Sequence, residues 1–248
     1  RSKLIYTLNR DANANLTISS PLEANRPTAI VQCIVGVDVG YENPVFASLE
    51  TDYADADADP TGEALARTEK RLTYYELDLG LNHVVRRWTE PVDRSAHHLI
   101  SVPGGYNYST EAWDGPSGVL VCIDDYIVYR HPDQPPHTVP IPVRENASIH
   151  RGSMIVASVL HKMKTSFFLL VQNEDGDLFK VTVEHDEEQV KAVRIKYFDT
   201  VPVSASLCIL RSGYLFVASD SGSQCLYAFE KLGDDDDEPE YLSTSHDG

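Results

Sequence analysis

Asp55, Asp57 and Asp59 are the residues whose types and spacing come nearest to a metal site, because they alternate with alanine like the first carboxylates of a calcium loop. An EF-hand loop also needs glycine at its sixth position and a bidentate glutamate at its twelfth. Those two positions hold Pro60 and Ala66. We therefore expect a solvated loop here, and the sequence predicts no metal-binding residue.

Histidine and cysteine are too scattered to suggest another metal or redox site. The adjacent pair His97-His98 has no third ligand at a zinc-binding spacing, and His83, His150 and His161 are equally isolated. No C-x-x-C pair is present, and each cysteine lies in an apolar stretch, which predicts small buried side chains in a reducing compartment. The four are Cys33, Cys122, Cys208 and Cys225.

Carboxylates and nucleophiles indicate no clearer active site. Residues 173–177 read Asn-Glu-Asp-Gly-Asp, which is typical of a hairpin turn, and no G-x-S-x-G motif is present. A two-carboxylate glycosidase site can escape notice in one sequence, and three N-x-S/T triplets begin at Asn15, Asn107 and Asn146. A secreted carbohydrate-binding or hydrolytic propeller domain therefore stays open as the alternative, although the N-terminal apolar block is too short for a signal peptide. We predict no catalytic and no cofactor-binding residue.

The charge of the chain argues against direct nucleic-acid binding. Lys and Arg number 21 against 38 Asp and Glu, a net charge of −17, whereas phosphate binding needs clustered basic residues. Such residues gather only at Arg86-Arg87 and at 161–164 with Arg194 and Lys196. The acidic run Asp234–Glu238 is typical of a tail or linker. No apolar run reaches the roughly eighteen residues of a membrane span, so we expect no membrane partner.

The elements that must position these residues are short strands at a regular period. Helical patterns are nearly absent, and Glu63–Glu69 could form two turns in an acidic insert that we expect to be a mobile loop. Four anchor strands are centred 52, 52 and 48 residues apart, on Tyr75, Ile127, Phe179 and Tyr227. Two apolar strands precede each anchor, and a fourth strand follows each of the first three. Four antiparallel strands at a period near 50 residues indicate a propeller blade.

We therefore predict an all-β fold, a β-propeller with divergent WD-like four-stranded blades that is incomplete and belongs to a larger multi-propeller protein. The rival is a β-sandwich. Trp113-Asp114 is a WD dipeptide, but it falls in a loop. The predicted parts are 1–24, outer strands of a preceding blade; 25–92, a blade with the acidic insert 52–70; 97–143 and 150–199, two whole blades; 203–233, a partial blade; and 234–248, an acidic tail or linker.

Two further expectations concern the blade interiors. The innermost strand of a blade should be apolar on both faces, as in Ile30–Val35, because stacked blades bury both. In the last blade, Leu207–Leu232, three strands alternate with two turns. Cys208, Cys225 and Tyr227 in that blade are expected to be core residues.

Long strings of sequence carry a resemblance to a known family. They include YELDLGLNHVVR at 75–86, IKYFDTVPV at 195–203 and GYLFVAS at 213–219, with shorter strings at 16–23, 36–44, 101–105, 114–120 and 232–236. These are similar to the first propeller of the splicing factor 3b subunit 3 family, the large multi-propeller subunit of the spliceosomal snRNP that recognises the branch site. The resemblance covers almost the whole chain and departs at Tyr106–Trp113 and His131–His150.

This resemblance implies a non-enzymatic scaffold that supports pre-mRNA splicing in the nucleus. It implies partners among the other splicing factor 3b subunits, chiefly the large helical-repeat subunit and a very small subunit. The family has no catalytic residues to carry over. The partner-binding residues stay unassigned, because a single sequence does not show which loops or blade faces meet a partner.

Overall fold

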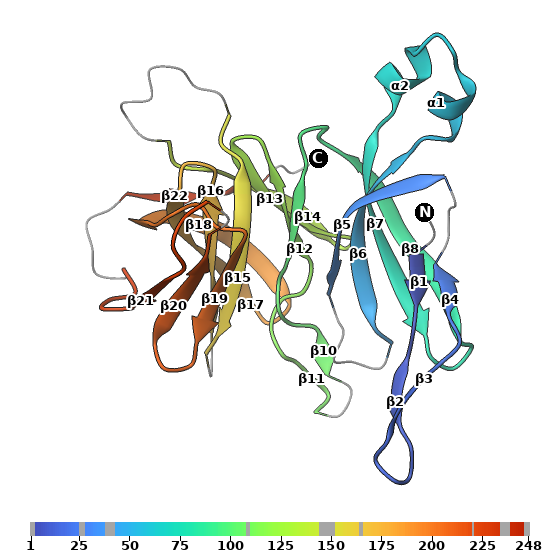
Figure 1. Ribbon diagram of the computed structural model, residues 1–248, viewed down its shortest axis with the longest axis horizontal. Helices are drawn as coiled ribbons and strands as arrows, with labels where there is room; N and C mark the ends of the chain where they lie inside the picture. Colours follow the sequence, from blue (N-terminus) through green and yellow to red (C-terminus); the bar gives the residue numbers. More distant parts are fainter. Residues whose placement is uncertain are drawn as a thin grey trace. The chain divides into compact units, whose positions relative to one another are not determined.

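The computed structural model describes residues 3–24, 28–37, 43–107, 110–143, 152–163, 166–219, 221–233 and 239–245 (Figure 1). The chain divides into two compact units. The first comprises Arg1–Arg94 and Tyr106–Ala112, and the second comprises Ser95–Gly105 and Trp113–Gly248. The acidic run Asp234–Glu238, the triplet at Asn146 and His150 lie outside the described residues.

The first unit contains a four-stranded antiparallel sheet in simple meander order. Its strands are β5 (Ala29–Gly36), β6 (Val45–Asp52), β7 (Lys70–Asp78) and β8 (His83–Val92). A long N-terminal hairpin is interrupted at its middle, so that two pairs form: β1 (Lys3–Ile5) with β4 (Leu22–Ala24), and β2 (Leu8–Arg10) with β3 (Leu16–Ile18). The strands predicted around Tyr75 are thus present, and the four pair in chain order.

The second unit holds three sheets, each again in meander order. The first contains β9 (His98–Ser101), β12 (Val119–Ile123), β13 (Tyr126–His131) and β14 (Gln134–Pro140). The next contains β15 (Ile155–Lys162), β16 (Phe167–Asn173), β17 (Asp177–Asp186) and β18 (Gln189–Thr200). The last contains β19 (Ser206–Leu210), β20 (Tyr214–Ala218) and β21 (Cys225–Ala228). A separate two-stranded sheet is formed by β10 (Tyr106–Asn107) and β11 (Ala112–Trp113).

Consecutive sheets of the second unit are joined by shared apolar cores. One core combines Leu120 and Ile127 of the first sheet with Leu169 and Phe179 of the second. Another combines Phe168 and Leu170 with Leu207, Leu215 and Val217 of the last sheet. Burial of apolar side chains between stacked sheets is the main stabilising term in such an arrangement. The prediction of an all-β fold built of stacked four-stranded blades is therefore confirmed.

Residues 240–245, which the sequence predicts to be part of an acidic tail or linker, form two further strands. β22 (Glu240–Leu242) pairs with β18, and β23 (Thr244–Ser245) pairs with β14. Each becomes the fifth strand of its sheet. Three and two residues are too few to show a periodicity in the sequence, so these strands were not predicted.

The acidic insert contains two short helices, α1 (Ala54–Ala58) and α2 (Glu63–Arg67). The second lies where the sequence indicated a helical tendency, at Glu63–Glu69. Asp59 connects them, because its carboxylate accepts hydrogen bonds from Thr61 N–H and Oγ at 2.8 and 2.6 Å and from Ala64 N–H at 2.8 Å. These bonds satisfy amide groups at the start of α2 that have no partner within the helix.

The expectations about blade interiors were partly wrong. Of the cysteines, Cys122 is buried, Cys33 and Cys225 are half-buried, and Cys208 is exposed. Tyr227 is 37% exposed, and the β5 residues Ile30 and Ile34 are 49% and 50% exposed. Each lies on a sheet face or edge that the described residues leave uncovered, whereas the prediction assumed a neighbour on both faces.

Candidate functional site: a protein-interaction surface

The three aspartates of the calcium-like pattern do not act together. Asp59 caps α2, and its hydrogen bond with Thr61 is the main cause of a lowered pKa. Asp55 and Asp57 lie within α1, where both are exposed. Among the described residues, no group of three or more His, Cys, Asp or Glu side chains is placed to hold a metal ion.

The adjacent residues His97 and His98 make hydrogen bonds that link two sheets. The His97 ring nitrogens lie 2.9 Å from Ser95 O and 3.0 Å from Ile155 O, and His98 Nε2 lies 3.1 Å from Ser158 Oγ. These contacts join β9 to β15. Burial, aided by the charge of His97, lowers the pKa of His98.

Residues 173–177 form the turn that their composition predicts. Asn173 Oδ1 accepts hydrogen bonds from the N–H groups of Asp175 and Asp177 at 3.1 and 2.9 Å. The Asp177 carboxylate accepts a hydrogen bond from the Thr200 hydroxyl at 2.5 Å. Gly176 has φ of +89°. These polar side chains therefore stabilise the connection between strands.

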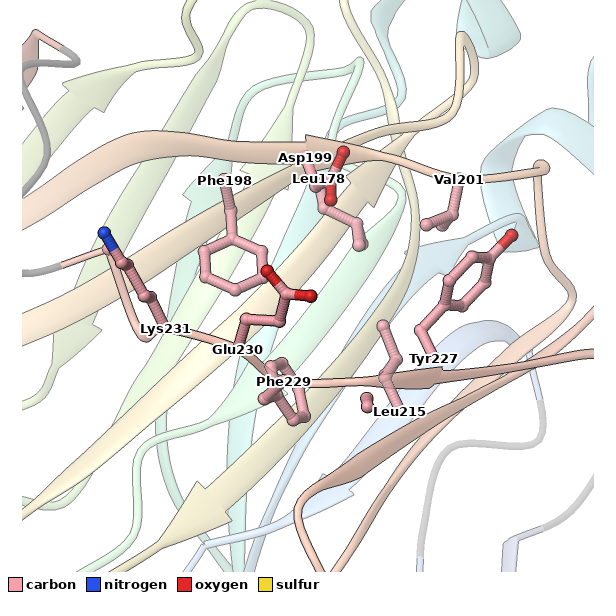
Figure 2. Close-up of a pocket in the computed structure, with 11 residues that line it drawn as sticks. Leu178, Phe198, Asp199, Val201, Leu215, Tyr227, Phe229, Glu230 and Lys231 are labelled. Carbon is pink, nitrogen blue, oxygen red and sulfur yellow. The ribbon is translucent and has the colours of Figure 1, made fainter.

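A cavity of about 340 Å³ opens beside β21 in the second unit (Figure 2). Apolar side chains of β17, β18 and the last sheet line it, including Leu178, Phe198, Leu215 and Phe229. The rings of Phe198 and Phe229 are 6.0 Å apart, and in Figure 2 they face the same space from opposite sides, with the Glu230 carboxylate between them. Concave space lined by both apolar and charged groups is suited to a side chain of a protein or ligand.

Two lysines hold the chain that leaves this cavity. Lys180 Nζ donates to Leu232 O at 2.9 Å, and Lys196 Nζ donates to Gly233 O at 2.7 Å. Residues 232–233 are thereby tied to β17 and β18 of the preceding sheet. This cavity was not predictable from the sequence, because its walls include residues of β17 and of the last sheet, which are distant in the chain.

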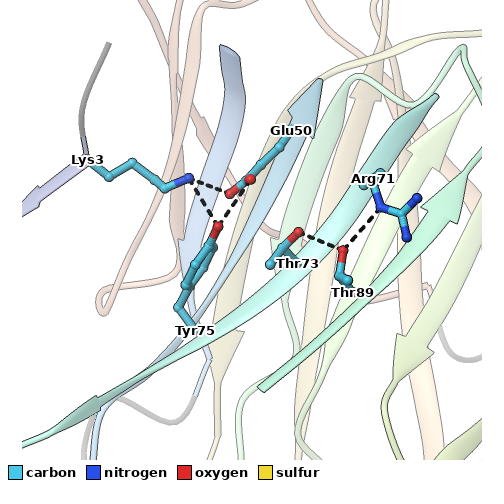
Figure 3. A network of polar contacts seen from close by, with 6 residues as sticks. All are labelled: Lys3, Glu50, Arg71, Thr73, Tyr75 and Thr89. Carbon is cyan, nitrogen blue, oxygen red and sulfur yellow. Dashed lines mark hydrogen bonds and ion pairs between the residues drawn. The ribbon is translucent and has the colours of Figure 1, made fainter. Parts of the chain in front are cut away.

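In the first unit, a polar network lies on one face of the sheet (Figure 3). Lys3 Nζ is 2.6 Å from Glu50 Oε1, and Tyr75 donates its hydroxyl proton to Glu50 Oε2 at 3.1 Å. Lys3 and Glu50 side chains are only 11% and 8% exposed. Beside them, Thr73 and Thr89 share a hydrogen bond of 3.0 Å. The network fixes the N-terminal hairpin to the inner strands of the sheet.

Next to this network is a wider cavity of about 650 Å³ below the insert, lined by residues of both charges such as Asp52, Asp55, Arg67, Arg71 and Arg86. The balance of charges gives it no preference for one class of ion. Arg67 is ion-paired with Glu63, and Arg71 with Glu69.

Large apolar side chains are exposed on the uncovered faces of several sheets. On the last sheet, Leu210, Tyr214, Phe216 and Leu226 are 37–57% exposed, and cross-strand pairing places Phe216 opposite Cys208 and Leu226. The N-terminal hairpin exposes Leu8, Leu16 and Ile18. Contiguous exposed apolar residues of this kind mark surfaces that meet other protein.

Similarity to known proteins extends over nearly the whole chain. Residues 1–245 match the family model described as the RSE1/DDB1/CPSF1 first beta-propeller. The chain is 65% identical over 251 residues to the pre-mRNA-splicing factor RSE1 of Mycosarcoma maydis, covering 100% of this chain and 21% of that protein. It is 54% identical to splicing factor 3B subunit 3 of Danio rerio and 50% identical to that of Drosophila melanogaster, in each case over 98% of this chain and 20% of the relative. The chain thus spans about a fifth of the length of these relatives.

Proposed function

Because the chain belongs to the family of the RSE1/DDB1/CPSF1 first β-propeller, we propose that it is part of a pre-mRNA-splicing factor and serves there as a non-catalytic scaffold. The observation that carries the proposal is the 65% identity, over the whole chain, to a protein named as a pre-mRNA-splicing factor. Its place of action would be the nucleus.

The hydrogen bonds of the side chains considered as catalytic candidates support a non-catalytic role. Asp59, His97 and Asp177 have hydrogen-bond partners that belong to caps, sheet junctions and turns. A general acid or base must instead reach a substrate from a concave site. In the part of the chain that the structure describes, no helix is long and apolar enough to span a membrane.

The surface supports the scaffold role. Rigid stacked sheets expose apolar residues such as Tyr214 and Phe216, and the net charge of −17 favours basic partners. The partners that we propose are the other splicing factor 3b subunits, chiefly the large helical-repeat subunit and the very small subunit. The relatives give no support to the alternative of a secreted carbohydrate-binding or hydrolytic domain.

Co-purification tests this proposal. The full-length protein would be tagged in its own cells, isolated from nuclear extract and analysed by mass spectrometry. We expect splicing factor 3b subunits in stoichiometric amounts, and recovery of the protein without splicing subunits would contradict the proposal.

A further inference from the structure

The outer strands of two neighbouring sheets, β14 and β18, each pair with one further short strand. β22 runs antiparallel to β18, with Glu240 opposite Lys196, Tyr241 opposite Ile195 and Leu242 opposite Arg194. β23 continues antiparallel to β14, with Thr244 opposite Thr138. Residues 240–245 are therefore seated across both sheets of the second unit. We call the surface beneath them, formed by β14 and by 193–196 of β18, the outer-edge site.

Two side chains of the segment make specific contacts in this site. The Ser243 N–H donates to Val193 O, and Val193 N–H donates to Ser243 Oγ, both at 2.9 Å. Ser243 Oγ also lies 3.5 Å from His137 Nδ1 on β14. Glu240 accepts a hydrogen bond from Arg194 at 2.7 Å. The site thus recognises an acidic residue and, three positions later, a hydroxyl residue.

The seated segment buries little of its own surface. Tyr241 and Leu242 are 38% and 50% exposed, and Glu240 is 41% exposed in its ion pair. Surface ion pairs of this kind contribute little to stability. Strands held mainly by a few exposed backbone hydrogen bonds open at low free-energy cost.

The two sheets remain joined without the segment. The Gln134 side chain on β14 donates to Glu188 O at 2.7 Å and accepts from Val190 N–H at 2.8 Å. The shared apolar core, with Val139 and Val193, lies beneath them. Release of residues 240–245 would therefore leave the sheets in place and expose the edges of β14 and β18. An exposed edge of this kind is a template for another strand.

We propose that the outer-edge site binds an extended segment of another protein, and that residues 240–245 occupy it in cis as an exchangeable substitute. The partner segment carries Asp or Glu three residues before Ser or Thr, as Glu240 and Ser243 do. Main-chain hydrogen bonds to β18 supply affinity, and the Arg194 contact supplies selectivity, as in other cases of strand addition. Arg194 is suited to this role because it presents a basic group on an acidic protein.

The proposal is tested by letting a free peptide compete with residues 240–245 for the outer-edge site. A tethered strand competes at an effective concentration on the order of millimolar, so a free peptide binds well only when the cis segment is weakened. Ser243→Pro removes both the N–H and the hydroxyl that contact Val193. The probe is a fluorescent peptide with the sequence of residues 239–245, titrated into the full-length protein and followed by anisotropy. We expect binding to the Ser243→Pro protein at least about tenfold tighter than to the unaltered protein.

The contact with Arg194 supplies matched controls. A peptide with Glu240→Lys should bind the Ser243→Pro protein at least about fivefold more weakly than the unaltered peptide. When Arg194→Glu is added to the Ser243→Pro protein, the Glu240→Lys peptide should bind more tightly than the unaltered peptide. Hydrogen exchange of the β18 amides should rise in the Ser243→Pro protein and fall again when the peptide is added. A second variant that deletes residues 239–245 should behave in the same way.

Absence of saturable binding to both variants, or equal binding of the two peptides, would overturn the proposal. A dimer that forms by exchange of residues 240–245 between two copies, detected by sedimentation, would also overturn it, because the occupant would then be a second copy. None of these measurements depends on splicing activity, so their failure is distinct from failure of the scaffold role.

Discussion

Gln172 Oε1 accepts two hydrogen bonds from Ser204, one from its N–H at 2.9 Å and one from its hydroxyl at 2.6 Å. Gln172 is completely buried at the end of β16. Its Nε2 group lies within 3.1–3.3 Å of the carbonyl oxygens of Gly176, Val201 and Pro202. One side chain therefore fixes the connection that leads from β18 into the last sheet.

Replacing Gln172 by leucine should destabilise the second unit. The substitution leaves buried N–H, hydroxyl and carbonyl groups without partners, and each such group costs about 1–3 kcal/mol. We expect the free energy of unfolding in urea to fall by roughly 3 kcal/mol. The control is Gln189→Leu at the exposed start of β18, where a change within about 0.5 kcal/mol is expected. Equal effects of the two substitutions would contradict this role of Gln172.

Two glycines with similar backbone angles should respond differently to alanine. Gly176 and Gly213 have φ of +89° and +82°, so both substitutions incur the left-handed strain of roughly 1–2 kcal/mol. A Cβ on Gly176 would lie 2.4 Å from Val201 O, whereas a Cβ on Gly213 would meet nothing within 4 Å. Gly176→Ala should therefore lower the free energy of unfolding by at least about 1 kcal/mol more than Gly213→Ala. The prediction fails if the thermal melts of the two variants coincide.

The Lys3–Glu50 pair should show strong non-additivity. Lys3→Met leaves the buried Glu50 carboxylate with Tyr75 and without a counter-charge, and loss of one partner of a buried pair costs roughly 3 kcal/mol. Adding Glu50→Gln to Lys3→Met should recover a large part of that loss, because the uncompensated charge is gone. A double-mutant cycle in urea checks this. Additive single and double variants would show that the pair is not coupled.

Buried histidines should make the second unit sensitive to mild acid. Burial lowers the pKa of His98, His131 and His137 below the ordinary value of 6.5. The unfolded chain then binds protons more readily than the folded chain as the pH falls below 6.5, so folding stability is full above that pH and declines below it. Carboxylates with lowered pKa, such as Glu76, titrate only in more acidic solution.

Urea unfolding at pH 7.5 and pH 5.5 measures this dependence. We expect lower stability at the acidic pH and a smaller difference in a variant with His98→Gln and His137→Gln, because these side chains no longer take up protons on unfolding. Stability that is unchanged or higher at pH 5.5 would contradict the sign of the prediction.

The strands were predictable because apolar residues recur at a fixed period and Gly and Asp occupy the turns between them. Glu240–Leu242 and Thr244–Ser245 were not, because three and two residues carry no periodicity and their pairing depends on distant strands. Gln172 directly follows an apolar stretch of sequence, but its role depends on Ser204, 32 residues away. Exposure of Cys208 was missed because alternation shows which residues share a face and not whether another sheet covers it.

Depletion of the full-length protein from a splicing extract tests the proposed role in splicing. The extract would be depleted with an antibody, supplied with a labelled pre-mRNA and then restored with purified full-length protein and its co-purified subunits. We expect unspliced pre-mRNA to accumulate after depletion and spliced product to return on restoration. Splicing at an undiminished rate in the depleted extract would contradict it.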